Sequence, residues 1–159
     1  MKAIICDVDG TLINNRYYEQ QFLTGQIDRQ EFYRVGDLHA PPITPVIEFL
    51  QQAAAKGHPI FYVTGRPEGT PHHPLETRLN LPPGIWIKKP HGTTSIAHKH
   101  TAAAHILYQY RTAHVLDDNP EHIWGYTQLD GITTTLIPGW NLEQHDQPIT
   151  PTLPKVENI

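Results

Sequence analysis

Short apolar runs alternate with longer amphipathic segments along most of this 159-residue chain. Runs with the apolar or β-branched composition of buried strands lie at 2–6, 59–63, 85–87, 113–116 and 132–137. Helices are predicted between them, at 45–56, 97–110 and 120–129. Strands that alternate with helices form parallel sheets, because each helix carries the chain back to begin the next strand. We therefore expect an α/β fold, a Rossmann-like three-layer sandwich with a mainly parallel central sheet.

The length fits a single domain with a substantial core. We expect this domain to span 1–137 and to carry a small cap insertion at 12–42, with a short helix at 28–35. A minimal cap leaves a site open, which favours an extended or macromolecular substrate, or a small substrate closed over by a partner subunit. The proline-rich stretch 138–159 is expected to be an extension that wraps the core or a neighbouring chain.

The composition argues against several classes of protein. Twelve Lys and Arg against sixteen Asp and Glu give no overall basic charge for binding nucleic acid or anionic membranes. No apolar stretch is long enough to span a bilayer or to act as a signal peptide, so a cytoplasmic location is expected. The single cysteine, Cys6, cannot form an internal disulfide, and the eleven histidines show no zinc-binding spacing.

The run Asp7-Val8-Asp9-Gly10-Thr11 directly follows the first apolar segment. Residues two apart point to the same side of a strand, so one carboxylate can attack phosphorus while the other lies near the leaving oxygen. Gly10 lets the backbone turn tightly beside the phosphate, and we assign Gly10 and Thr11 to substrate binding. The alternative is a turn in which Asp and Gly serve only the backbone geometry.

A second polar group, Thr64-Gly65-Arg66, follows the second apolar run. The Thr64 hydroxyl can donate to a phosphate oxygen, and Gly65 permits close approach of the backbone. The guanidinium of Arg66 matches phosphate geometry, which makes it a plausible substrate clamp. The alternative is a strand-ending turn with an arginine in solvent.

The acidic pair Asp117-Asp118 follows the fourth run. Adjacent carboxylates at the sheet edge that carries Asp7 suit Mg²⁺, although the same residues with Asn119 could simply cap the next helix. A lysine that offsets this charge has three competing positions, Lys88, Lys89 and Lys99, of which we favour Lys99 near the start of a helix. Its alternative is a solvated lysine on an exposed helix face.

These groups all follow predicted strands, where ligands bind in open α/β sheets. The run at 7–11 resembles motif I of the haloacid-dehalogenase-like (HAD) phosphohydrolases, 64–66 resembles motif II and 115–119 motif IV. The resemblance implies that Asp7 is the nucleophile, Asp9 the general acid/base and Lys99 the motif III lysine, while Thr64 binds the phosphoryl group. It further implies Mg²⁺ as cofactor, held by Asp7, the Asp9 carbonyl, and Asp117 or Asp118.

The stretch 63–70, the helix with Lys99 and the run leading to Trp124 look most like the phosphatase domain of polynucleotide 5′-kinase/3′-phosphatases. That resemblance implies a Mg²⁺-dependent phosphomonoester hydrolase that forms an aspartyl-phosphate and acts on 3′-phosphate ends of nucleic acid. A kinase half is not expected, since no Walker A pattern occurs. Two alternatives stay open: a phosphatase of a small metabolite such as a nucleotide or sugar phosphate, and a non-catalytic Mg²⁺-binding regulatory domain.

The expected partner is thus a phosphorylated substrate, either a nucleic-acid end or a nucleotide, and a homo-oligomer stays open. In the cap insertion, Arg16, Tyr17 and Tyr18 could stack on a base or could simply anchor the insertion by packing.

Overall fold

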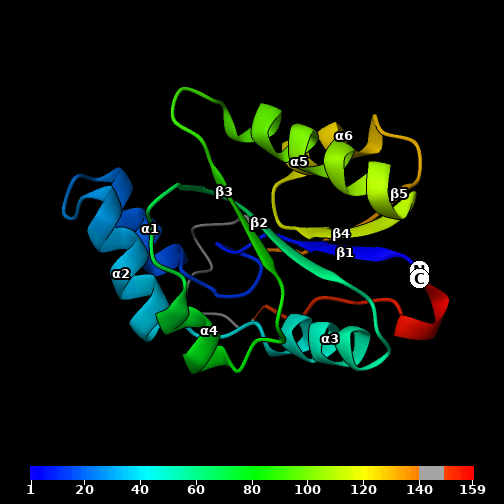
Figure 1. Cartoon of the computed structure of the whole chain (residues 1–159). Coiled ribbons are helices and arrows are strands. Elements are labelled where there is room, and N and C mark those ends of the chain that lie inside the picture. Colours follow the sequence, from blue (N-terminus) through cyan, green and yellow to red (C-terminus); the bar gives the residue numbers. More distant parts are fainter. Residues whose placement is uncertain (140–148) are drawn as a thin grey trace.

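A computed structural model describes residues 1–139 and 149–159. Within these ranges the strands form one parallel sheet in the order β3-β2-β1-β4-β5 (Figure 1). The strands are β1 (Ala3–Cys6), β2 (Ile60–Pro67), β3 (Ile85–Lys89), β4 (Ala113–Asp117) and β5 (Ile132–Leu136). In the centre, Ile5 pairs with Phe61 on one side and Val115 on the other. The predicted α/β fold with a parallel central sheet is confirmed.

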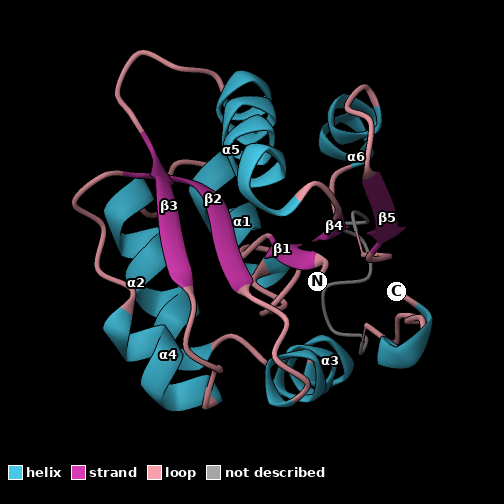
Figure 2. Cartoon of the chain, turned by 45° about the vertical axis from the view of Figure 1, so that its right-hand side comes forward, coloured by secondary structure: helices cyan, strands magenta, loops and turns pink. Residues whose placement is uncertain are grey.

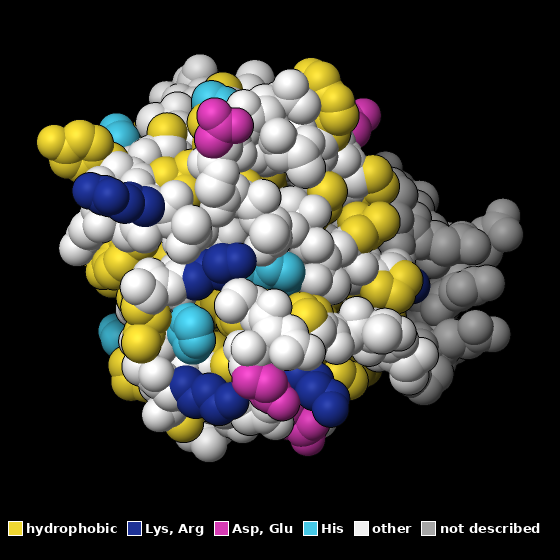
Figure 3. Space-filling view, turned by 90° about the vertical axis from the view of Figure 1, so that its right-hand side faces the viewer, with side chains coloured by type: hydrophobic (Ala, Val, Ile, Leu, Met, Phe, Trp, Pro, Cys, Tyr) yellow, Lys and Arg dark blue, Asp and Glu magenta, His cyan; other side chains and the backbone are white. Residues whose placement is uncertain are grey.

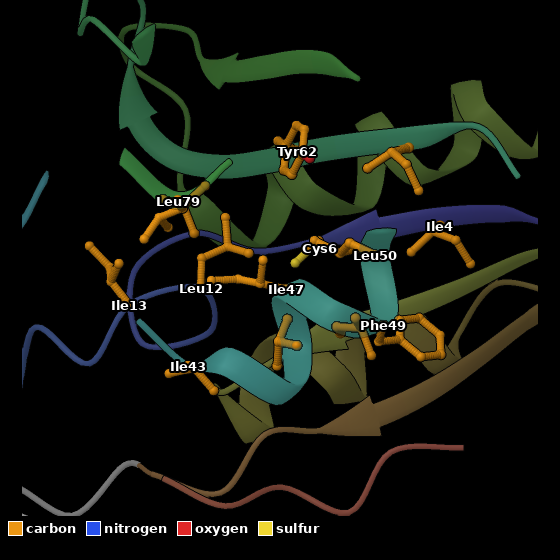
Figure 4. Packing of buried hydrophobic residues seen from close by; sticks show 14 of the residues in the cluster. Ile4, Cys6, Leu12, Ile13, Ile43, Ile47, Phe49, Leu50, Tyr62 and Leu79 are labelled. Atoms are coloured by element: carbon orange, nitrogen blue, oxygen red, sulfur yellow. The ribbon is translucent and has the colours of Figure 1, made fainter. Parts of the chain in front are cut away.

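Helices cover both faces of the sheet, which gives three layers (Figure 2). One face carries α5 (Ser95–Tyr110) and α6 (Pro120–Thr127), and the other carries α3 (Thr44–Ala55) and α4 (His73–Leu79). Successive strand residues point to opposite faces, so Ile4 and Cys6 pack with α3 while Ile5 packs with α5. Figure 4 shows the first of these two cores, with Leu50 beside the sheet residues.

The strand β2 is longer than predicted, because it runs on through Thr64, Gly65 and Arg66 to Pro67. These residues have the composition of a turn, but a register shift against β3 between Val63 and Pro67 lets pairing continue past them. As a result, the second polar group lies within the end of a strand instead of in a free loop.

Two helices of the segment expected to form a cap, α1 (Arg16–Leu23) and α2 (Arg29–His39), lie at the carboxyl end of the sheet (Figure 1). The sequence predicted only part of α2 and missed α1. Asp28 caps α2 by accepting the Glu31 N–H at 2.8 Å, and the rings of Phe22 and Phe32 stack with centroids 5.6 Å apart. The side chain of Arg78 in α4 donates to three backbone carbonyls near the end of α2, those of Gly36, Asp37 and Ala40. The ring stack therefore joins α1 to α2, and Arg78 ties α2 to the core.

Both chain ends lie at the amino end of the sheet, away from α1 and α2 (Figure 1). Val156, in the short helix η2 (Val156–Asn158), is buried in the core beside α3, and Glu157 pairs with Lys56 at 3.4 Å. Figure 3 shows that charged side chains of both signs occur on the face that carries the ends. Residues 140–148 of the expected extension lie outside the described residues. Among the helices of the described ranges, none has the length and apolar character to cross a bilayer.

Candidate active site

Three carboxylates converge where β1 and β4 end. Asp7 follows β1, Asp117 ends β4 and Asp118 comes next, and each offers an oxygen within 4.8 Å of the other two. The two strands are adjacent, and the Asp7 N–H donates to the Leu116 carbonyl at 2.9 Å. The parallel pairing itself thus brings residues more than one hundred positions apart into one cluster.

A buried lysine from α5 faces this cluster. Lys99 Nζ lies 2.8 Å from Asp7 Oδ1 and 2.6 Å from Asp117 Oδ2. The other two lysines considered above are directed elsewhere: Lys88 donates to the Thr70 carbonyl and Lys89 to the Thr93 carbonyl. Of the three, Lys99 is the one placed to offset charge on Asp7.

Negative charge exceeds positive charge in the cluster. Burial and the neighbouring carboxylate of Asp117 raise the pKa of Asp7, and burial together with Asp7 and Asp117 raises the pKa of Asp118 well above its ordinary value. Burial also acts to raise the pKa of Asp117, but Lys99 and His122 together outweigh it and the pKa is lowered. Carboxyl groups whose pKa values are raised by burial and by one another's charge form a suitable donor set for a hard divalent cation such as Mg²⁺. The cluster therefore fits the metal that the sequence suggests.

Gly10 and Thr11 lie against the carboxylates of the cluster. Gly10 has φ of +80°, and a Cβ at this position would overlap the Asp118 carboxylate. Thr11 Oγ1 lies 3.3 Å from both Asp7 Oδ2 and Asp118 Oδ1, and the residue is fully buried behind them. Thr11 thus bridges two carboxylates, while Gly10 leaves room for them.

The carboxylates open into a cavity of about 440 Å³. Its walls include seven of the predicted site residues: Asp7, Asp9, Gly10, Gly65, Arg66, Lys99 and Asp118. Thr64 and Asp117 are buried next to it, and Thr64 Oγ1 accepts the Arg66 N–H at 3.1 Å. The cap helices contribute Arg16, Glu19, Arg29, Phe32 and Tyr33 to the opposite wall. By contrast, Tyr18 packs against the core.

Asp9 and Arg66 form an ion pair inside this cavity. Arg66 Nε and Nη2 donate to the two Asp9 oxygens at 3.0 and 2.7 Å. The remaining side of the guanidinium faces Asp37 of α2, with Nη1 2.9 Å from Oδ2 and Nη2 2.8 Å from Oδ1. The predicted phosphate clamp is therefore directed at two carboxylates in this structure.

Several residues of the site were not found by sequence reasoning. Asn15 Nδ2 donates to Asp9 Oδ1 at 2.7 Å, and His122 Nδ1 lies 3.0 Å from Lys99 Nζ. His122 stands in the first turn of α6, three residues after Asn119, whose side chain caps that helix. The position of His122, three residues after a helix-capping residue that follows the acidic pair, was the sequence signal that could have identified it. Asp37 lies in no recognisable motif and carried no such signal.

Two further groupings lie beside the site. A second cavity, of about 810 Å³, is lined by α2 and by the 67–71 loop, and it shares Arg29 and Tyr33 with the first. At the start of α4, ligand atoms of the N-cap residue His72 and of His73 and Glu76 lie within 4.8 Å of one another. The histidines are therefore less scattered than the sequence suggested.

Comparison with known proteins identifies the family. The sequence profile of the HAD superfamily, subfamily IIIB (acid phosphatase), matches residues 1–82, which is more than half of the chain. A search of functionally curated proteins finds no match.

Solved structures resemble the chain at low sequence identity. A chain of the Pnkp1/Rnl/Hen1 complex superposes with a TM-score of 0.65 at 20% identity, over 85% of this chain and 44% of that one. In a second structure, of the Pnkp1/Rnl/Hen1 RNA repair complex, the values are 0.66 and 20%, over 86% and 42%. This chain thus spans less than half the length of those two proteins. A haloacid dehalogenase-like hydrolase from Streptococcus pneumoniae gives 0.62 at 16% identity, over 93% of this chain and 91% of that one.

The likeness to these structures is one of fold, whereas the profile match concerns the sequence itself and covers Asp7-Val8-Asp9-Gly10-Thr11 and Thr64-Gly65-Arg66. The chain belongs to the HAD superfamily, in subfamily IIIB, and is a phosphatase.

Proposed function

We propose that the chain hydrolyses phosphomonoesters in two steps, with Asp7 as nucleophile and Asp9 as general acid and base. The observation that carries this proposal is the position of Asp7: its carboxylate opens into the cavity and contacts the buried ammonium group of Lys99 at 2.8 Å. An oriented carboxylate beside a fixed cation is suited to attack a phosphorus atom whose oxygens are negatively charged.

In the first step, an Asp7 oxygen bonds to phosphorus, the bond from phosphorus to the leaving oxygen breaks, and Asp9 gives a proton to the leaving alcohol. In the second step, water attacks the aspartyl-phosphate while Asp9 takes a proton from it. The bond between Asp7 and phosphorus then breaks, which restores the carboxylate and releases inorganic phosphate. Lys99, Thr64 and the backbone at Gly10 and Gly65 bind the phosphoryl oxygens, and Thr11 fixes the Asp7 carboxylate.

Asp7, the Asp9 carbonyl and Asp117 or Asp118 would hold Mg²⁺. When bound, the ion offsets the negative charge on the transferred phosphoryl group and on the carboxylates. The excess of carboxylates over lysine in the cluster supports this assignment.

For the substrate, we propose a 3′-phosphate end of nucleic acid. Two features support it. The fold resembles chains of an RNA repair complex, and a second cavity adjoins the catalytic one, with Arg29 and Tyr33 lining both. The two cavities together give room for more than a phosphate and one sugar. An arginine and an aromatic ring at the junction suit a nucleotide backbone and base.

The experiment measures phosphate release with Mg²⁺ from p-nitrophenyl phosphate, a 3′-phosphorylated oligonucleotide, the matching 3′-mononucleotide and a sugar phosphate. All turnover should disappear in Asp7→Asn, and turnover that persists in this variant would contradict the nucleophile assignment. The oligonucleotide should have the highest kcat/KM, because contacts remote from the phosphate contribute to transition-state binding.

A variant of the second cavity tests the substrate separately. Leu38 lines this cavity and not the catalytic one, so Leu38→Asp should lower kcat/KM for the oligonucleotide and leave the mononucleotide unchanged. Equal rates for both substrates, unaffected by this change, would favour a metabolite phosphatase.

A further inference from the structure

The carboxylate of Asp9 is held in place from the cap side. Both of its oxygens accept hydrogen bonds from Arg66, and one also accepts from Asn15 at 2.7 Å. The Asp9 side chain is a quarter exposed, whereas Arg66 is almost completely buried. Arg66 is therefore the more enclosed partner of this pair, and its guanidinium sets where the Asp9 carboxylate points.

The guanidinium is itself fixed by α2. Asp37 Oδ2 accepts from Arg66 Nη1 at 2.9 Å, and Asp37 Oδ1 lies 2.8 Å from Nη2 in an ion pair. The ring of Tyr33 lies over the guanidinium with its centroid 4.8 Å from Cζ. Burial alone would lower the pKa of Arg66, but the carboxylates of Asp9 and Asp37 raise it. The arginine is thus charged, buried and contacted from α2 on two sides.

Few donors of Arg66 are left for a phosphate. An arginine side chain has five N–H donors in a planar fork. Three of them donate to carboxylate oxygens here, and Nη2 also lies in ion-pair contact with Asp37 Oδ1. A bidentate grip on phosphate requires two neighbouring donors, which would have to be withdrawn from Asp9 or Asp37. The geometry therefore favours an indirect role for this residue.

We infer that Asp37 and Arg66 are positioning residues that transmit the placement of the cap helix α2 to the general acid/base Asp9. The inference rests on the role of Asp9 under the proposed function. A carboxylate that must first reach the leaving oxygen and then an attacking water needs a defined orientation, and α2 supplies it through one buried arginine. Proton transfer by Asp9 consequently depends on correct docking of the cap.

The test uses Asp37→Asn, with Glu31→Gln as its matched control. Both change an acid to its amide on α2, but Glu31 pairs with the exposed Arg34 and does not line either cavity. Turnover is measured with an alkyl phosphate and with p-nitrophenyl phosphate, whose leaving group needs little protonation. General acid catalysis contributes roughly 10²- to 10⁴-fold, so we expect Asp37→Asn to lower kcat for the alkyl ester by at least about tenfold and for the aryl ester by far less.

Arg66→Lys provides a second variant, which keeps the charge and loses the fork. It should show the same dependence on the leaving group, and Asp37→Glu should restore part of the alkyl rate. Thermal unfolding checks that each variant is folded. Equal losses on both esters would reduce Asp37 to a structural role and overturn the inference, as would an effect of Glu31→Gln equal to that of Asp37→Asn.

Asp9→Asn separates this inference from the proposed function. If Asp9→Asn discriminates between the two esters and Asp37→Asn does not, only the positioning role is wrong. If Asp9→Asn itself affects both esters equally, the acid/base assignment and the inference both fail.

Discussion

Replacement of Lys99 by methionine should destabilise the metal-free protein strongly. Methionine keeps the length and apolar character of the side chain but removes the ammonium group that contacts Asp7 and Asp117. Asp117 is fully buried, so its charge is left without its cation. Removing one partner of a buried ion pair costs about 3–5 kcal/mol in the free energy of unfolding. For a domain of this size, that loss lowers Tm by about 6–20 °C.

The loss should depend on pH in a defined direction. Burial alone lowers the pKa of Lys99, but Asp7 and Asp117 raise it well above its ordinary value, and Lys99 in turn acts to lower the pKa values of both carboxyl groups. Without the ammonium group, these pKa values rise in the folded state, and the folded protein then binds protons more readily than the unfolded chain. Its stability therefore increases as pH falls. The difference from the parent protein should be largest near neutral pH and shrink toward pH 4.

Urea unfolding in EDTA at pH 7.5, 6 and 4.5 measures this difference. Lys89→Met is the control, because Lys89 is only partly buried and donates to a backbone carbonyl; its effect should stay within about 1 kcal/mol. If Lys99→Met stays within about 1 kcal/mol of the parent protein at pH 7.5, the carboxylates do not carry the charge assigned to them and the argument for a cation site fails.

Three other changes give distinct expectations. Asp118→Asn should raise the Mg²⁺ concentration needed for half-maximal turnover, and a metal titration that superposes on that of the parent protein would remove Asp118 from the metal site. Gly10→Ala should lower the free energy of unfolding by about 1–3 kcal/mol and abolish turnover, whereas Gly25→Ala, at φ +77° in open space, should retain activity. Thermal unfolding and turnover are measured for both variants. Equal behaviour of the two would contradict the predicted overlap between a side chain at position 10 and Asp118. Burial lowers the pKa of His114 to about 4 between the hydroxyls of Thr133 and Thr135, so its contribution to stability is present above about pH 6.5 and is lost as pH falls toward 4. In His114→Gln, the free energy of unfolding measured at pH 4.5 and 7 should differ less than in the parent protein, and an unchanged difference would rule this contribution out.

The central sheet could be predicted because the apolar composition of a buried strand is a local property of the sequence. A buried strand needs an apolar run, and Ile4, Ile5 and Cys6 supply it without reference to distant residues. The clustered carboxylates could be predicted for a related reason, since parallel strands end at a common edge. Asp7 and Asp118 could therefore be grouped before their contacts were known.

Contacts across the cap could not be predicted in this way. Asp37 reaches Arg66 because α2 docks on the carboxyl end of the sheet, and no local pattern encodes the angle of that docking. Arg66 looked like a phosphate ligand because its residue type suits one, whereas its burial depends on Tyr33 and Asp37 from another part of the chain. Similarly, the end of β2 depends on pairing with β3 and not on the turn composition of 64–67.

The location of the chain ends has a consequence for rebuilding this phosphatase. Both ends flank the turn after α3, where Met1 lies near Gly57 and Glu157 pairs with Lys56. A short linker could therefore join them, and new ends could be opened in the exposed turn at Gly25 between the cap helices. Such a circular permutant would keep every strand of the sheet in place while turning α1 and α2 into the two terminal helices. Because each would then be tethered to the core at one end only, the permutant would show how much of the catalytic geometry depends on the covalent continuity of the cap.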